Sequence, residues 1–494
     1  MIKNQQYINV SLKLILFCVL IYFPIFLNLD TLPIRIWDES RLAINSYEMY
    51  KNGNYLVSYF DGHSDLWNTK PPFLLWLQVG FFKLLGPGEL ALRLPSALAA
   101  FFTCLALLLF SLNYLKDYWF GLIATLVLVT SYGYINIHST RTGDYDALLT
   151  FFTTVYAIFF FLFIEKGNKK YLHLFFLTLT LAILTKSIQG LIFLPALFIY
   201  ILFEKKWRVL KNKWLYIDFL ICLIIVAAFY LSREHYDSGF LKAVWENELG
   251  GRYATTLENN KGGDFTFYFN MLVDHHYAEW YLFVPCGIAI GLFLKDEKIR
   301  KITLFSSLLI LVYLLVVSFS QTKLEWYEIP LFPFLAIVVS TTIYVVFIYL
   351  KKLPYFIQLF KINIIPYVFL FVLFISPYEK MINKVYYSHE YEWDRNFYEI
   401  SNYLKKAVKK ELSIKNNYLC YTGYNAHLLF YVNILNDNKQ NVSFKDWNSL
   451  MPENIVIASQ TEVQSEIEKN YNYELLSDWH NVKKYKIYGR KTIN

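Results

Sequence analysis

The sequence predicts a mostly α-helical, polytopic membrane bundle followed by a small C-terminal α/β domain. Apolar runs of membrane-spanning length recur between residues 12 and 375, and 56% of all residues are hydrophobic while 17% are charged. Lys and Arg gather in short segments between these runs, not in a stripe with interleaved aromatic residues. The formal net charge of +8 therefore indicates membrane anchoring and does not predict a nucleic-acid partner.

Eleven apolar runs are candidates for membrane spans. The first, Leu12–Leu29, has Lys3 before it and Lys13 at its start and precedes no small-residue cleavage site, so we expect an uncleaved signal anchor. Tyr171–Leu184 is short for a full crossing. The other runs are Leu94–Leu112, Trp119–Tyr134, Ala147–Ile164, Leu191–Phe203, Leu215–Leu231, Tyr281–Leu294, Ile302–Phe319, Ile329–Leu350 and Ile362–Ile375. We expect about 11–13 spans in all.

The basic residues between the runs predict the orientation. The clusters within 166–170, 205–213, 295–301 and 351–352 fall on one side if the spans alternate. That side is cytoplasmic by the positive-inside rule. The extracytoplasmic side then carries the C-terminal tail and the loops 30–93, 135–146, 185–190, 232–280 and 320–328.

We expect two domains. Residues 1–378 form the transmembrane domain, whose first outer loop, 30–93, contains helical spacing over Ser40–Lys51 and a short amphipathic segment over Pro72–Leu85. Residues 379–494 form the α/β domain, with a helix over Tyr391–Lys409 and buried strands in 418–423 and 454–458.

Four acids in the outer loops are candidates for chemistry. Asp38 and Glu39 lie close to the end of the first span, where a carboxylate beside an apolar wall gains proton affinity and suits a general base. Solvated loop carboxylates are the plain alternative. Asp144 and Asp146 begin the fourth span, with Arg141 as a candidate ion-pair partner. An acid that only satisfies the helix N-terminus is the alternative for Asp146.

Cations in the same loops predict an anionic ligand. Lys70, Lys186, Arg252 and Lys323 oppose the usual charge bias, and phosphate is the obvious anion for them, although isolated exceptions are ordinary. His275 and His276 are weak candidates for a divalent metal, because adjacent histidines cannot easily hold one ion together. Interfacial polar residues are the alternative for this pair.

Six motifs together resemble glycosyltransferase family 39, over roughly residues 10–350. This family includes protein O-mannosyltransferases and aminoarabinose-lipid A transferases and has the GT-C fold. The motifs are Trp37–Ala43, Asn68–Phe73, Gly88–Ser96, Asp146–Phe152, Leu184–Gly190 and Lys323–Tyr327. The resemblance implies an inverting transferase in a bacterial inner membrane. It would move a sugar from a polyprenyl-phosphate carrier to a hydroxyl or phosphate of a lipid, glycan or protein acceptor on the outer face.

The same resemblance assigns roles to individual residues. Asp38 matches the family's catalytic aspartate, and Glu39 matches its acidic neighbour, which helps to place the acceptor. Lys70 matches the lysine that meets the carrier phosphate, and Asp146 matches the acid that opens the fourth span. Thr69 stands where aminoarabinose transferases carry a Glu that is associated with a metal site, so this departure leaves a metal cofactor open.

Two rival functions make different predictions. A transporter or flippase of lipid-linked sugars would carry charged residues at the middle of its spans and inverted repeats, whereas the ionisable clusters here lie in loops. An oligosaccharyltransferase would carry a Trp-Trp-Asp signature, which the sequence lacks.

Overall fold

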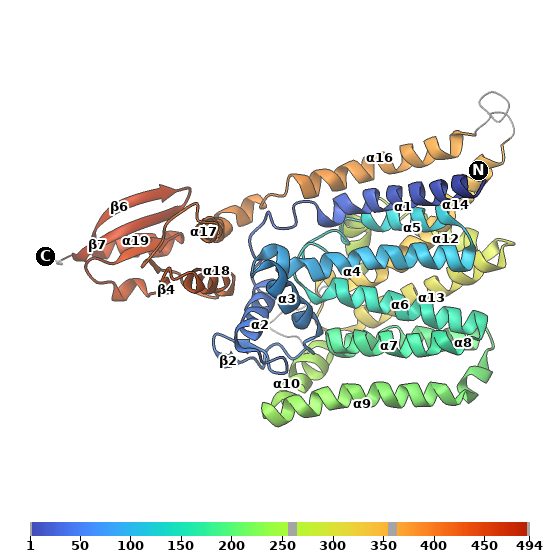
Figure 1. Cartoon of the computed structure of the whole chain (residues 1–494), viewed down its shortest axis with the longest axis horizontal. Coiled ribbons are helices and arrows are strands. Elements are labelled where there is room, and N and C mark those ends of the chain that lie inside the picture. The colour runs from blue at the N-terminus through green and yellow to red at the C-terminus, as the bar shows by residue number, and fades with distance from the viewer. Residues whose placement is uncertain (1, 255–263, 354–362, 492–494) are drawn as a thin grey trace.

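The apolar runs form a bundle of helices that lie side by side, and a tail with a β-sheet extends from one end of this bundle (Figure 1). The structure, a computed structural model, describes residues 2–254, 264–353 and 363–491. The mostly α-helical fold with a small C-terminal α/β region is therefore confirmed.

Each of the eleven predicted spans coincides with a helix. In the described residues, seven segments are long and apolar enough to cross a membrane, and they contain α4 (Glu89–Phe110), α6 (Tyr145–Lys166), α7 (Lys169–Lys186), α9 (Lys213–Tyr236), α13 (Glu297–Phe319), α14 (Phe332–Lys351) and α16 (Ile365–Tyr386). The other four predicted spans contain shorter apolar stretches, in α1 (Ile2–Phe26), α5 (Tyr118–Val129), α8 (Leu194–Phe203) and α12 (Phe283–Phe293). The start of the last predicted run, Ile362, lies outside the described residues. The chain is a multi-pass membrane protein.

The span that looked short in the sequence is longer in the structure. Helix α7 continues past Leu184 to Lys186, and a 3₁₀ turn at Ser187–Leu191 extends the apolar segment to 23 residues. The helix can keep Lys186 at its end because the ammonium group lies 2.6 Å from the carboxylate of Asp146 on α6. Pairing across the bundle therefore lengthens this span.

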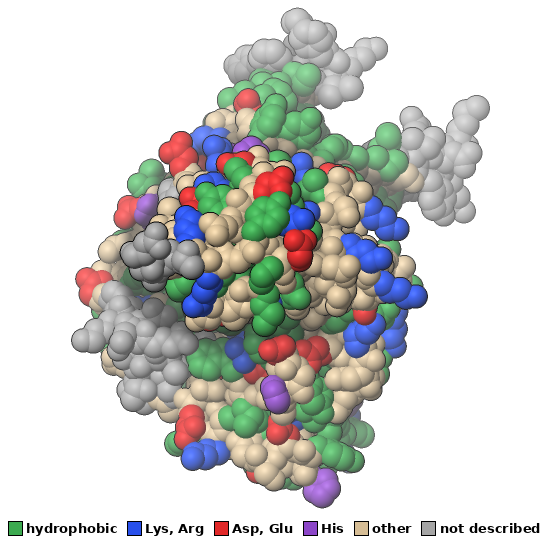
Figure 2. Space-filling model, turned by 90° about the vertical axis from the view of Figure 1, so that its left-hand side faces the viewer, with side chains coloured by type: hydrophobic (Ala, Val, Ile, Leu, Met, Phe, Trp, Pro, Cys, Tyr) green, Lys and Arg blue, Asp and Glu red, His purple; other side chains and the backbone are tan. Residues whose placement is uncertain are grey.

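The predicted outer loops meet at the end of the bundle that faces the tail (Figure 1). The first loop forms α2 (Asp38–Asn52), α3 (Phe73–Leu85) and a hairpin of β1 (Tyr59–Phe60) and β2 (His63–Ser64), so both helical segments expected there are present. The basic turn between α6 and α7 lies at the opposite end of the bundle, the end at which the N-terminus also lies. Figure 2, which looks at the tail end, shows acidic and basic side chains of both signs spread over the surface.

Short helical segments connect these elements. They are the π-helices η1 (Ser111–Leu115), η4 (Trp245–Ala254) and η5 (Leu272–His276), the 3₁₀ segments η2 (Ser187–Leu191), η3 (Trp207–Lys211) and η6 (Glu325–Leu331), and the helices α10 (Phe240–Val244) and α11 (Phe267–Met271).

The tail folds as a mixed five-stranded sheet with three helices. Its strand order is β4-β3-β5-β7-β6, in which β3 pairs in parallel with β4 and β5, while β7 pairs antiparallel with β5 and β6. The helix expected over Tyr391–Lys409 and both expected strands are present. The bounds are α17 (Glu392–Val408), β3 (Tyr418–Leu419), α18 (Ala426–Asp437), β4 (Ser443–Phe444), η8 (Trp447–Ser449), β5 (Ile455–Ala458), α19 (Thr461–Asn470), β6 (Tyr471–Trp479) and β7 (Val482–Arg490).

The tail packs directly on the first loop. Ile44 of α2 and Leu92 of α4 belong to the same buried cluster as Leu428 and Tyr431 of α18. The Tyr431 hydroxyl donates to Glu89 at 2.7 Å and accepts from the backbone N–H of Ile34 at 3.0 Å. The core of the tail is thus continuous with that of the loop, and the division of the chain at residue 378 stays a prediction.

Candidate active site

The candidate base, Asp38, directly follows a residue with a strained backbone, Trp37. Trp37 has φ 69° and ψ −115°, a conformation that non-glycine residues rarely adopt, and α2 begins at the next residue, Asp38. The helix N-terminus favours a carboxylate at this position. The Asp38 side chain is 53% exposed, so it is accessible to a substrate.

The neighbouring acid, Glu39, is completely buried and holds three segments together. Its Oε1 accepts from Arg93 Nε at 2.7 Å and from the backbone N–H of Gly143 at 2.9 Å. Its Oε2 accepts from Arg93 Nη2 at 2.9 Å and from the backbone N–H of Arg35 at 2.8 Å. Burial alone raises the pKa of the Glu39 carboxyl, but Arg93 and these N–H groups together lower it below its ordinary value. Glu39 thereby fixes the start of α2.

The segment between α5 and α6 brings a histidine to the acids. His138 Nδ1 lies 3.3 Å from Asp144 Oδ2 and 3.9 Å from Asp38 Oδ2, and the ring stacks on Trp326 with centroids 3.8 Å apart. Burial alone would lower the pKa of His138, but Asp144 and Asp38 raise it to about 9. At neutral pH an imidazolium therefore lies between two aspartates. Thr142 Oγ1 orients Asp144 by donating to its Oδ2 at 2.5 Å.

Two of the predicted lysines pair with carboxylates on other elements. Lys186 at the end of α7 donates to Asp146 Oδ1 at 2.6 Å, and both side chains are about 5% exposed or less. Lys70, before α3, lies 3.3 Å from Glu248 of η4. Thr69 Oγ1 also donates to Glu248, at 3.0 Å. A carboxylate from a distant segment thus lies beside position 69, where the sequence departs from the family pattern.

Several of the residues described above line one polar cavity. Five of the nine predicted acidic and basic site residues line it, namely Asp38, Lys70, Asp144, Asp146 and Lys186. An apolar groove of about 440 Å³ adjoins the cavity and shares Asp146 and Tyr327 with it. Most of its other lining residues are apolar, including Leu149, Ile188, Leu191, Ile192, Val316 and Val317. The cavity combines acids with cations, and the groove adds a surface for an apolar chain.

The other candidates lie elsewhere. Arg141 contacts neither aspartate, because its guanidinium donates to the carbonyl oxygens of residues 25, 27 and 28, so the proposed pairing is wrong. Lys323 donates to the Ser320 carbonyl at 2.8 Å. Arg252 falls in η4, but its side chain lies outside what the structure describes.

The histidine pair is divided between surface and interior. His275 is exposed, whereas His276 is buried with Nδ1 2.5 Å from Glu328 Oε1. Across residues 2–254, 264–353 and 363–491, no group of three His, Cys, Asp or Glu side chains is placed to hold a metal ion. The described residues therefore do not fit a metal site here.

Sequence reasoning missed Arg41, which lines the cavity, and also Asp65 and His138, which pair with residues that line it. Arg41 forms a two-pronged ion pair with Asp65, at 2.6 and 2.9 Å, and Asp65 Oδ1 also accepts from the backbone N–H of Asn68. Burial raises the pKa of Asp65, but Arg41 and the hydrogen bonds together lower it. Arg41 lies in the motif Trp37–Ala43 and could have been predicted as a site residue, whereas Asp65 and His138 have no local signal in the sequence.

Comparisons with known proteins agree with this architecture. The model of the family described as dolichyl-phosphate-mannose-protein mannosyltransferase matches residues 69–231. An uncharacterized protein of Aquifex aeolicus (strain VF5) is 27% identical over 334 residues, which are 66% of this chain and 62% of that protein. The matched part of this chain thus spans less than two thirds of that relative's length.

Solved structures share the fold. The crystal structure of ArnT from Cupriavidus metallidurans bound to undecaprenyl phosphate has a TM-score of 0.69 at 14% identity, over 96% of this chain and 97% of that one. The Archaeoglobus fulgidus oligosaccharyltransferase in the apo form has a TM-score of 0.55 at 13% identity, over 87% and 64%. The resemblance expected from the motifs is confirmed: the chain shares the GT-C fold of these structures, and the family model matches part of its sequence.

Proposed function

We propose that this protein is an inverting glycosyltransferase that moves a sugar from a polyprenyl-phosphate carrier to a hydroxyl or phosphate acceptor. The observation that carries the proposal is the polar cavity, in which Asp38, Lys70 and Lys186 meet beside an apolar groove. A polyprenyl-phosphate sugar has the matching parts, which are a long apolar chain, an anionic phosphate and a polar sugar. The ArnT structure was solved with undecaprenyl phosphate, a carrier of this class.

The groove and the lysines suit the donor. The polyprenyl chain would lie along Ile188, Leu191 and Val317, with its phosphate near Lys186 and Lys70. When the bond between the anomeric carbon and the phosphate oxygen breaks, the electron pair stays on the phosphate. Fixed cations stabilise this growing negative charge more in the transition state than in the bound donor.

Asp38 suits the role of general base. It is the exposed acid of the cavity, so an acceptor hydroxyl can reach it. As the acceptor oxygen attacks the anomeric carbon from the face opposite the phosphate, its proton passes to Asp38. Glu39 acts as a positioning residue, because its hydrogen bonds hold the start of α2 to Arg93 on α4 and to the backbone of Arg35 and Gly143.

We further propose that the cavity opens on the extracytoplasmic side of a bacterial plasma membrane. Its loops lie at the end of the bundle opposite the basic turn between α6 and α7. Substituted-cysteine labelling tests this orientation. A cysteine placed at Asp61 in the first loop should react with a membrane-impermeant maleimide in intact cells, and one at Lys206 should react only after lysis.

The central test follows label from a panel of polyprenyl-phosphate sugars. Membranes that contain the wild type should transfer a sugar to endogenous acceptors, and Asp38→Asn should lower the rate about 10²–10⁴-fold, because it removes the base but keeps the shape. Asn52→Asp, at the far end of α2, is the control for altered charge on the same helix. Retention of most activity by Asp38→Asn would remove Asp38 from the base role.

The same assay addresses the transporter alternative. If the folded wild type transfers no sugar from any donor but moves labelled carrier across vesicle membranes, the transferase proposal fails. The positions of Asp146 and Lys186, at helix ends and not at mid-span, favour the transferase.

A further inference from the structure

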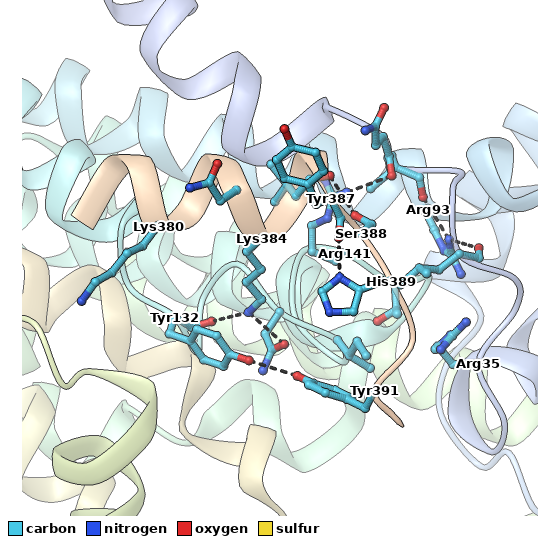
Figure 3. A pocket seen from close by; sticks show the side chains of 18 residues that line it. Arg35, Arg93, Tyr132, Arg141, Lys380, Lys384, Tyr387, Ser388, His389 and Tyr391 are labelled. Carbon is cyan, nitrogen blue, oxygen red and sulfur yellow. Dashed lines mark hydrogen bonds between the residues drawn. The ribbon is translucent and has the colours of Figure 1, made fainter. Parts of the chain in front are cut away.

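A second cavity lies behind the segment that carries His138 and Asp144. It has a volume of about 610 Å³ and is bordered by four parts of the chain, which are the residues that follow α1, Arg93 on α4, the segment 132–142, and the last turns of α16 with the residues that follow it (Figure 3). Five cations line it, namely Arg35, Arg93, Arg141, Lys380 and Lys384. It shares no lining residue with the polar cavity of the candidate active site.

Three of these cations have carboxylate partners. Arg35 binds both carboxylate oxygens of Glu390, at 2.5 and 2.6 Å, and Arg93 is held by Glu39. Lys380 lies 3.3 Å from Glu279. Their charges are therefore compensated within the protein.

The other two cations contact neutral groups. Arg141 donates to the carbonyl oxygens of residues 25, 27 and 28 at 2.7–3.0 Å. Lys384 Nζ donates to the carbonyl of Ile135 at 2.8 Å and to Asn136 Oδ1 at 3.1 Å, and it lies 3.2 Å from the centroid of the Tyr132 ring (Figure 3). Within the described residues, neither forms an ion pair with a carboxylate.

In the described part of the chain, this arrangement leaves the Arg141 guanidinium and the Lys384 amine without a countercharge in a partly dehydrated place. Burial and the nearby Arg93 lower the pKa of Arg141 to about 10, which shows that its surroundings disfavour further positive charge. Carbonyl dipoles and an aromatic face compensate a cation only in part. An anion in the cavity would offset both the burial of these cations and their mutual repulsion. Phosphate oxygens accept hydrogen bonds from a guanidinium and from an ammonium group alike.

The place of the cavity in the bundle indicates how the anion arrives. The cavity lies where α1 and α16 end, and both helices expose apolar side chains along their length, such as Leu14 and Ile15 on α1 and Phe371 and Val372 on α16. Such faces contact lipid in a membrane protein. A lipid beside these helices would bring its headgroup level with Lys384 and Arg141.

We propose that this cavity is a second anion site, which binds the phosphate of a lipid headgroup and braces the segment beside the catalytic acids. Thr142 connects the second cavity to the candidate active site, because it lines this cavity while its hydroxyl orients Asp144. Arg93 carries a second link through Glu39, the neighbour of Asp38. The binding of the phosphate does not depend on whether the proposed transferase reaction is correct.

Native mass spectrometry of the delipidated full-length protein tests the site, with phosphatidic acid as the probe. The wild type should retain one phosphatidic acid with saturable affinity, and Lys384→Gln should weaken this binding about 10- to 100-fold. Lys384→Arg keeps the charge and should keep binding. Lys295→Gln, an exposed lysine at the other end of the bundle, makes the same charge change and should have no effect.

Further arms separate the sources of the anion. Uncharged diacylglycerol should not compete, and glycerol 3-phosphate should compete only weakly. If glycerol 3-phosphate binds as tightly as the lipid, the site serves a soluble phosphate and the lipid assignment is wrong. Equal loss of binding in Lys384→Gln and Lys295→Gln, or no saturable binding by the wild type, would overturn the site altogether.

A second variant covers the case in which Lys384→Gln does not fold. Asn383 is exposed and lines the cavity, so Asn383→Trp fills the space without removing a cation. It should also abolish retention of phosphatidic acid. Unchanged retention by a folded Asn383→Trp protein would contradict the proposal.

Discussion

The segment between α5 and α6 separates two polar regions that treat buried charge in different ways. On one side, the cavity around Asp38 places its buried ions beside opposite charges, as Asp146 with Lys186 and Asp144 with His138. On the other side, Arg141 and Lys384 contact carbonyl oxygens. The first region is compensated within the protein, and the second has charge left for a ligand.

Neighbouring sites in one membrane-embedded fold can thus serve different functions through the way their charges are compensated. Internal ion pairs fix catalytic groups in place before a substrate arrives, which lowers the cost of reorganisation during the reaction. Cations that meet only dipoles gain most when an anion binds. If this distinction holds, the loss of one charge should destabilise the first region much more than the second.

The largest effect is expected from breaking the pair on the compensated side. Asp146→Ala should destabilise the protein by about 3–5 kcal/mol, because it strands the charge of Lys186 in a buried site. The double variant Asp146→Ala/Lys186→Met should recover part of this loss. Detergent-solubilised protein, followed by tryptophan fluorescence during unfolding, supplies the measurement.

The matched change on the other side is Lys384→Gln. It removes the repulsion with Arg141 and leaves a donor for the carbonyl oxygens, so stability should change by about 1 kcal/mol or less. Equal destabilisation by Asp146→Ala and Lys384→Gln would erase the distinction between the two regions.

A smaller loss of stability is expected from Glu39→Gln, which removes the negative charge that compensates Arg93. The variant should lose about 2–3 kcal/mol, because Arg93 keeps its charge but loses its carboxylate partner. Since Arg93 also lines the second cavity, phosphatidic acid should restore more stability to this variant than to the wild type.

The neighbouring residue supplies the control for Glu39. Asp38→Asn changes the same charge on the half-exposed side of α2 and should alter stability by no more than about 0.5 kcal/mol. If Asp38→Asn destabilises the protein as much as Glu39→Gln, the separate roles of the two adjacent acids are wrong.

The last effect concerns pH. Because the pKa of His138 is raised to about 9 in the fold, its charged form adds stability that is fully present below pH 6.5 and is lost as pH rises through 9. The wild type should therefore lose roughly 2–5 °C of Tm over this range. His138→Gln should flatten this part of the profile, and an unchanged profile would show that Asp144 and Asp38 do not hold the proton on His138.

Much of the fold and part of the site were predictable from the sequence. Hydropathy located the eleven predicted spans, each of which coincides with a helix, and the charged residues of the outer loops included five that line the polar cavity. The predicted pairing of Arg141 with an aspartate was wrong, because Arg141 donates to carbonyl oxygens at the end of α1. Asp146 instead pairs with Lys186 at the end of α7. The partner of Lys70, Glu248, lies 178 positions away in sequence and left no pattern that could reveal it.

The sequence by itself determined the membrane bundle, the grouping of its loops and the acids and cations that those loops carry. These properties depend on the composition of contiguous segments, which hydropathy and local charge report directly. Only the tertiary structure decided which of two adjacent acids is buried, which cations are compensated and where the cavities lie. Such outcomes depend on contacts between helices distant in the chain, as when Glu39 binds both Arg93 and Gly143, and no local pattern encodes them.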